Sequence, residues 1–271
     1  MTAGSTFRGR YERAASTNES LLCVGLDPDP RRIPEGVGML DFLRDIVEAT
    51  ADLVCCFKPN AAFFESRGPA GVEELRTLIA AIPDEVPVLL DAKRGDIGNS
   101  SEHYARGVFE QLGAHGVTVS PYLGRDAVEP FLAYEDRHSF VLCRTSNAGA
   151  GDFQDLPVGE GGRPLYLQVA AAASTWNTRG NVGLVVGATY PGEAAEVRAL
   201  CPDMLLLMPG VGAQAGDLEA AVQAAVDAEG GGILVNASRG VLYAGADGDH
   251  ATAARAEATR LRDAINAARR G

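Results

Sequence analysis

The segment Leu90–Ile97, LDAKRGDI, brings three titratable side chains together within six residues. It closes an apolar run that is typical of a buried strand. Because side chains two positions apart in a strand share a face, we expect Asp91 and Lys93 to point the same way at the strand's C-terminal end. Asp96 falls beyond the strand, in a turn that opens at Gly95. A surface ion pair that merely ends a strand gives the same local pattern, so the rest of the chain must decide between the two interpretations.

The elements that position this segment repeat along the chain. Apolar runs alternate with stretches of helical periodicity, which favours parallel strands buried on both faces. Eight such units in 271 residues predict a (β/α)8 TIM barrel, here a single domain over residues 1–271. We expect the preceding helix, Phe7–Ser16, to cover the barrel floor. The eight expected strands are Leu21–Leu26, Leu53–Phe57, Val86–Leu90, Gly116–Val119, Ser139–Leu142, Val182–Val186, Met204–Met208 and Gly232–Val235.

A doubly wound open sheet is the competing architecture. It often binds dinucleotides through a Gly-x-Gly-x-x-Gly turn after its first strand. The sequence has no such turn there, which weakens that interpretation.

Composition limits the partners. A net charge of −12 argues against binding to nucleic acid or an anionic membrane, so an anionic ligand must be attracted by a few local cations. No apolar stretch approaches the ~20 residues of a membrane helix, and no signal peptide follows Met1. Five cysteines, mostly within apolar runs and without metal-ligand spacing, indicate reduced thiols, no metal site and a cytoplasmic location.

Nearly every expected strand ends in a polar side chain. In a TIM barrel that rim is the active-site face, and charges placed there are partly desolvated and must pair. The candidate residues at the strand ends are Asp27, Lys58, Asp91, Lys93, Ser146, Pro209 and Arg239.

Two loops near the end of the chain predict a phosphate site. A glycine-rich loop, Pro209–Asp217, enters a helix, and Ser238–Gly240 follows the eighth strand. TIM barrels often bind phosphate between the loops after strands seven and eight, with backbone N–H groups at a helix N-terminus. Arg239 adds a cation able to bind phosphate through two hydrogen bonds, with Gly240 beside it.

A set of motifs runs through nearly the whole chain: Asp27, Phe57–Asn60, Asp91–Ile97, Tyr122–Gly124, Thr145–Asn147, Pro209–Gly212 with Gln214, and Ser238–Gly240. In this order they resemble the orotidine 5'-phosphate decarboxylase family, and Tyr122–Gly124 and Thr145–Asn147 indicate its longer bacterial subgroup. The sequence departs from the family pattern at Ala215, where the family commonly has glycine, and at Ser100, where many members have threonine. The loop Ser146–Gly162 is also longer than in the compact members.

The resemblance implies decarboxylation of orotidine 5'-phosphate to UMP, in pyrimidine biosynthesis, with no cofactor. Loss of CO2 would leave a ring carbanion with no adjacent electron sink, so the protein must stabilise it electrostatically. Lys93 would be the counter-ion and proton donor, held by Lys58 and Asp96. Asp91 would repel the departing carboxylate.

The resemblance also implies the binding residues and a homodimer. Asp27 and Lys58 would contact the ribose, and Ser146 the pyrimidine. Gln214 would bridge base and phosphate, and Pro209, Arg239 and Gly240 would line the phosphate end. Asp96 and Ser100 would reach the partner subunit's site.

Three alternatives stay open. A Schiff-base aldolase would use Lys58 or Lys93 as nucleophile, although neighbouring carboxylates keep a lysine protonated. A non-catalytic nucleotide-binding barrel would bind UMP without turnover. A magnesium-dependent sugar-phosphate decarboxylase would share the Asp-x-Lys-x-x-Asp motif.

Overall fold

The structure, a computed structural model, describes residues 6–210, 215–245 and 249–271. Within these ranges eight parallel strands form one sheet, in the order β2-β1-β10-β9-β8-β5-β4-β3. Bridges between Phe57 and Val88 and between Asn60 and Asp91 join β2 to β3 and close the sheet. The expected TIM barrel is confirmed, and the open-sheet alternative is excluded by this closure. The barrel strands are β1 (Leu22–Leu26), β2 (Cys56–Pro59), β3 (Leu89–Arg94), β4 (Gly116–Val119), β5 (His138–Arg144), β8 (Val182–Val186), β9 (Leu206–Pro209) and β10 (Ile233–Ala237).

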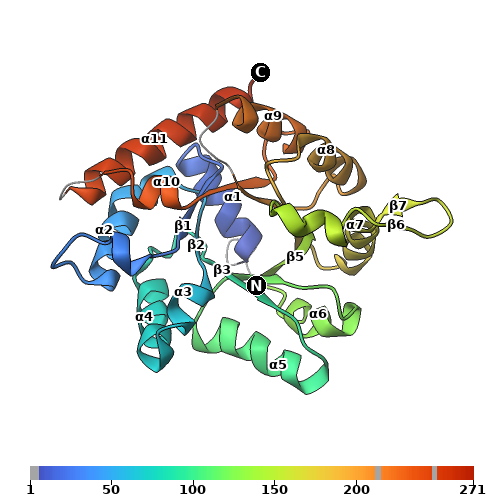
Figure 1. Cartoon of the computed structure of the whole chain (residues 1–271), viewed down its shortest axis with the longest axis horizontal. Coiled ribbons are helices and arrows are strands. Elements are labelled where there is room, and N and C mark those ends of the chain that lie inside the picture. The colour runs from blue at the N-terminus through green and yellow to red at the C-terminus, as the bar shows by residue number, and fades with distance from the viewer. Residues whose placement is uncertain (1–5, 211–214, 246–248) are drawn as a thin grey trace.

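Helices surround the strands on the outside of the barrel (Figure 1). A π-helical turn, Gly107–Gln111, extends α5, and a two-stranded hairpin, β6 (Pro157–Val158) with β7 (Arg163–Pro164), lies in the loop after β5. The helices are α1 (Phe7–Thr17), α2 (Met39–Thr50), α3 (Ala61–Glu65), α4 (Gly68–Ala81), α5 (Gly98–Arg106), α6 (Arg125–Leu132), α7 (Leu165–Trp176), α8 (Pro191–Leu200), α9 (Ala215–Ala225), α10 (Arg239–Leu242) and α11 (His250–Ala268).

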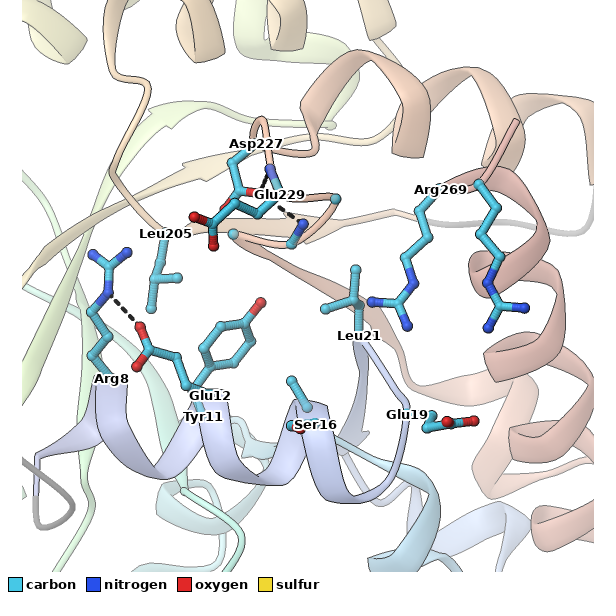
Figure 2. Close-up of a pocket in the computed structure, with 15 residues that line it drawn as sticks. Arg8, Tyr11, Glu12, Ser16, Glu19, Leu21, Leu205, Asp227, Glu229 and Arg269 are labelled. Atoms are coloured by element: carbon cyan, nitrogen blue, oxygen red, sulfur yellow. Dashed lines mark hydrogen bonds and ion pairs between the residues drawn. The ribbon is translucent and has the colours of Figure 1, made fainter.

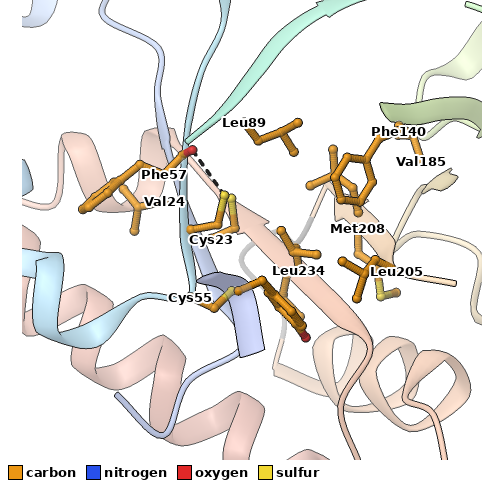
Figure 3. Close-up of a cluster of buried hydrophobic side chains, with 14 of the residues drawn as sticks. Cys23, Val24, Cys55, Phe57, Leu89, Phe140, Val185, Leu205, Met208 and Leu234 are labelled. Carbon is orange, nitrogen blue, oxygen red and sulfur yellow. Dashed lines mark hydrogen bonds between the residues drawn. The ribbon is translucent and has the colours of Figure 1, made fainter. Parts of the chain in front are cut away.

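The strands are apolar along their whole length because the barrel interior covers one face and the helices cover the other. Every residue of β1, β4 and β8 is buried. Phe57, Phe140, Met208 and Leu234 belong to the interior cluster shown in Figure 3. All five cysteines are buried free thiols, as the sequence predicted.

Helix α1 covers the barrel floor, as expected. The ring of Phe7 stacks on His138, with centroids 5.2 Å apart, and Tyr11 Oη donates to the Ile233 carbonyl at 2.9 Å. His138 and Ile233 begin β5 and β10, so these contacts lie at the N-terminal ends of the strands. A cavity of about 550 Å³ separates α1 from the turn 227–232, with the Arg8–Glu12 ion pair at its edge (Figure 2).

Several expected strands are displaced along the sequence; Met204–Met208, for example, is observed as Leu206–Pro209, and Gly232–Val235 as Ile233–Ala237. The run Leu53–Phe57 begins in a 3-10 helix, Ala51–Leu53, and pairing starts only at Cys56. The run Val86–Leu90 is buried before it pairs, and β3 continues past it to Arg94. An apolar run therefore gives the wrong bounds for β2 and β3. The apolar residues that lead into a barrel strand are buried as deeply as the strand itself.

Candidate active site

Asp91, on β3, is the centre of a charged cluster at the C-terminal mouth of the barrel. Its Oδ1 accepts hydrogen bonds from Lys93 Nζ at 2.6 Å and from Thr118 Oγ1 at 2.9 Å. Its Oδ2 accepts from Lys58 Nζ at 3.0 Å and from Asn60 Nδ2 at 3.4 Å. The cluster therefore combines two cations, one carboxylate and two neutral donors.

An irregular end to β3 places Lys93 in this cluster. The register with β4 shifts between Leu90 and Arg94, and Lys93 has a left-handed φ of 48°. Thr118 Oγ1 on β4 accepts from the backbone N–H groups of Ala92 at 3.0 Å and Lys93 at 2.9 Å, which satisfies donors that the bulge removes from the ladder. The two side chains meet as expected, although the regular strand alternation on which we based that expectation is not what brings them together.

Lys58 is held as a buried cation. It is 3% exposed, and that burial alone would lower its pKa. The carboxylates of Asp27 and Asp91 outweigh the burial, so the pKa of Lys58 is raised above its ordinary value. A buried charge of this kind requires its partners, and Lys58 is therefore fixed between the ends of β1 and β3.

Asp91 is correspondingly held as a carboxylate. Burial raises its pKa, but Lys58 and Lys93 outweigh that effect and lower the pKa of Asp91 to about 2. The side chain of Lys93 is 51% exposed and lies on the open side of the cluster. The chain contains two lysines in all, and both belong to this site.

Asp96 and Ser100 lie outside the cluster of their own chain. Asp96 Oδ1 accepts from the backbone N–H of Ile97 at 2.8 Å, and no ion pair joins it to Lys93 in the described part of the chain. Ser100 is exposed in the first turn of α5. The carboxylate that contacts Lys93 is Asp91, and the roles of Asp96 and Ser100 stay predictions.

A cavity of about 810 Å³ opens beside the cluster at the ends of β1 and β10. Asp27, Gly210, Arg239 and Gly240 line it, and Arg239 is exposed at the start of α10. Asp27 Oδ1 is buried without a hydrogen-bond partner among the described residues, which leaves an acceptor for a bound molecule. The structure thus places Asp27 and Arg239 at one opening, which Gly210 at the end of β9 also lines.

Two further candidate residues, Pro209 and Ser146, also lie at or just after strand ends. Pro209 is the half-buried last residue of β9, and Ser146 is half-buried two residues after β5. Gln214 lies outside the described residues. No group of three or more His, Cys, Asp or Glu side chains within residues 6–210, 215–245 and 249–271 is arranged to hold a metal ion.

Thr118 is the residue that sequence reasoning missed. It is 1% exposed, yet its hydroxyl makes three hydrogen bonds at the centre of the site. The available signal was a lone hydroxyl in the otherwise apolar strand GVTV, facing opposite to Val117 and Val119.

The barrel and its charged mouth define a class: a TIM-barrel enzyme whose site is built at the C-terminal ends of the strands. Comparison with known proteins places the chain within that class. Residues 20–256 match the model of the Orotidine 5'-phosphate decarboxylase / HUMPS family.

Curated relatives agree with that match. An orotidine 5'-phosphate decarboxylase of Roseiflexus castenholzii is 56% identical over 265 residues, covering 96% of this chain and 97% of that protein. One from Thermomicrobium roseum is 54% identical over 271 residues, covering 98% and 96%. The solved structure of Leishmania donovani OMP decarboxylase superposes with a TM-score of 0.88 at 43% identity, covering 98% of this chain and 99% of that one. The chain therefore belongs to the orotidine 5'-phosphate decarboxylase family, and it is a carboxy-lyase.

The helices carry no membrane-spanning candidate. Across the described residues, none is both long and apolar enough to cross a bilayer.

Proposed function

We propose that this protein decarboxylates orotidine 5'-phosphate to UMP, in pyrimidine biosynthesis, without a cofactor. The observation that carries the proposal is the Lys58–Asp91–Lys93 cluster, in which one carboxylate is held between two lysines. The family match supports the reaction class, and the cluster supports the way in which the reaction is performed.

The chemistry requires a cation at the ring carbon that loses CO2. When the C–C bond breaks, its electron pair stays on that carbon and CO2 leaves as a neutral molecule. The ammonium group of Lys93 stabilises the developing carbanion and then donates a proton to it, becoming a neutral amine that water reprotonates. The exposure of Lys93 on the open side of the cluster suits this role.

Asp91 acts on both the lysines and the substrate. Its charge keeps Lys93 oriented, and Lys58 keeps Asp91 ionised. A substrate carboxylate bound about 4 Å from Asp91 would be repelled by roughly 4 kcal/mol at an effective dielectric constant near 20. Departure of CO2 removes that repulsion, which favours the transition state over the bound substrate.

The cavity beside the cluster would bind the rest of the nucleotide. Arg239 and Gly240 at the start of α10 would bind the phosphate, together with Pro209 and Gln214. Asp27, with its unpartnered oxygen, would accept a hydrogen bond from a ribose hydroxyl. Ser146 would bind the pyrimidine.

The same geometry favours decarboxylation over a Schiff-base mechanism. A lysine nucleophile must lose its proton before it attacks a carbonyl group. Lys58 is buried between two carboxylates that raise its pKa, and Lys93 contacts Asp91 at 2.6 Å. The environment of Lys58 therefore favours the charged ammonium over the neutral amine that a Schiff-base mechanism needs.

We further propose a cytoplasmic homodimer in which Asp96 and Ser100 complete the partner's site, each subunit being one barrel domain. Asp96 makes no ion pair with Lys93 of its own chain within the described residues. Next to it Ile97 is 60% exposed, and Tyr122 in the following loop is 83% exposed. Exposed apolar side chains beside an acidic residue are suited to contact with a second copy.

The test is Lys93→Ala. We expect kcat for orotidine 5'-phosphate to fall by at least about 10⁴-fold, since one residue supplies both charge stabilisation and the proton. UMP affinity, measured by calorimetry, should stay within about tenfold, because the phosphate and ribose contacts survive. Arg125→Ala, which removes an exposed cation on α6, is the matched control and should change neither value. Near-normal kcat in Lys93→Ala would contradict the proposal.

A further inference from the structure

Gln154 fixes the backbone next to Ser146. It lies in the loop between β5 and α7, and its Oε1 accepts a hydrogen bond from Thr145 N at 2.8 Å. Its Nε2 donates to Thr145 Oγ1, also at 2.8 Å. One side chain thus binds both the backbone and the hydroxyl of the residue that precedes Ser146, and this leaves Thr145 little freedom to rotate.

Arg144, at the end of β5, anchors the side chain of Gln154. This last residue of β5 has a side chain that is 4% exposed, and its Nη1 donates to Gln154 Oε1 at 3.4 Å. Its Nη2 donates to Asp155 Oδ2 at 3.3 Å, and the guanidinium lies over the ring of Tyr190, 4.2 Å from its centroid. Because a buried guanidinium is costly to leave unpaired, it ties this part of the loop to the barrel.

Ser146 is confined on its other side by two glycines. A Cβ added at Gly187 would lie 2.9 Å from Ser146 N, and one added at Gly210 would lie 3.1 Å from Ser146 Oγ. Gly210 follows β9 and lines the cavity beside the charged cluster. The hydroxyl of Ser146 therefore faces the ends of β8 and β9, and Ser146 Oγ has no hydrogen-bond partner in the described part of the chain.

We propose that Gln154 is a positioning residue for pyrimidine recognition: anchored by Arg144, it holds Thr145 so that the Ser146 hydroxyl is presented to the base. Gln154 itself need not touch the substrate. This inference rests on the proposed function, because it assigns Ser146 the pyrimidine contact, and it adds a residue outside the motifs that point to the family.

The test separates recognition of the base from recognition of the sugar phosphate. In Gln154→Leu we expect the Kd for UMP and the KM for orotidine 5'-phosphate to rise about tenfold, the effect of losing one well-placed hydrogen bond. The Kd for ribose 5-phosphate, which lacks the base, should change by less than about twofold because its contacts are elsewhere. Gln223→Leu, an exposed glutamine on α9, is the matched control and should behave as wild type.

Two further variants keep the test decisive. In Gln154→Glu, the carboxylate can accept from both Thr145 groups and pair with Arg144, so most of the UMP affinity should return. Thr145→Val keeps nearly the same shape and removes the hydrogen bond from Gln154 Nε2, together with the one that Thr145 Oγ1 donates to Asn147 Oδ1 at 2.6 Å. It replaces Gln154→Leu in the comparison if that variant does not fold.

A double-mutant cycle with Ser146→Ala identifies the route of action. If Gln154 acts through Ser146, adding Gln154→Leu to Ser146→Ala should weaken UMP binding by less than about twofold further. Fully additive losses, an unchanged Kd for UMP in Gln154→Leu, or an equal loss for ribose 5-phosphate would each overturn the inference. Failure of the proposed function would show differently: Ser146→Ala alone would leave UMP binding unchanged, or the wild type would not consume orotidine 5'-phosphate.

Discussion

Replacing Asp91 by asparagine removes one charge from the site and keeps the side chain's shape. Lys58 then stays buried with Asp27 as its remaining carboxylate. Asp91 has a folded pKa of about 2 against an ordinary value of 3.8. The gap between these two pKa values corresponds to about 2 kcal/mol, with little reduction for solvent because the side chain is 12% exposed. We therefore expect Asp91→Asn to lower the free energy of unfolding by about 2–3 kcal/mol at pH 7.

The contribution of Asp91 to the free energy of unfolding should decrease as the pH falls. Because the pKa of Asp91 is lower in the folded state, its contribution is complete above about pH 5 and is lost as the pH falls through 4 towards 2. The difference between wild type and Asp91→Asn should accordingly shrink below about 1 kcal/mol near pH 2.5. Other carboxylates titrate in both proteins, so the difference between the two isolates Asp91.

Guanidinium unfolding at several pH values measures this difference, at one fixed protein concentration in case subunits associate. Asp203→Asn, at an exposed position, is the control and should lie within about 0.5 kcal/mol of wild type at pH 7. A loss for Asp91→Asn below about 1 kcal/mol at pH 7, or a difference that does not shrink in acid, would refute the idea that two lysines hold Asp91 charged.

Three further predictions concern binding, assembly and lysine reactivity. Arg239→Ala should lower kcat/KM for orotidine 5'-phosphate by about 10²-fold or more but change turnover of the phosphate-free nucleoside little, and equal losses would place Arg239 away from the phosphate. Mixing Lys93→Ala with Asp96→Ala subunits after dissociation should restore roughly a quarter of the sites, since half the dimers are then mixed and each mixed dimer has one intact site. If mixed dimers form and the activity is no higher than that of the separate variants, the shared site is refuted. An amine-reactive probe followed by peptide mass spectrometry should modify half-exposed Lys93 and spare buried Lys58, and labelling of both at similar rates would contradict the buried ion pair.

The barrel could be predicted from the sequence because its strands are nearly continuous apolar runs. For β4 and β8 the run and the paired segment coincide, so their bounds were predicted correctly. For β2 and β3 the bounds were wrong, because burial begins before pairing in both strands.

The charged cluster was predictable in part. The rule that parallel strands end at one face predicts that Lys58, Asp91 and Lys93 lie together. The left-handed backbone of Lys93 was not predictable, because it depends on hydrogen bonds that the N–H groups of Ala92 and Lys93 donate to Thr118 on the neighbouring strand. Likewise, no local pattern indicates that Gln154 folds back onto Thr145, since the two residues meet through the path of an irregular loop.

We infer that this chain decarboxylates orotidine 5'-phosphate through its own charged side chains. The most direct measurement follows orotidine 5'-phosphate absorbance with the purified wild-type protein after dialysis against EDTA, with UMP identified by chromatography. We expect full turnover in EDTA, with one UMP formed for each substrate molecule consumed. Tight binding of UMP with no change in absorbance, or activity that returns only when a divalent metal is added, would contradict it.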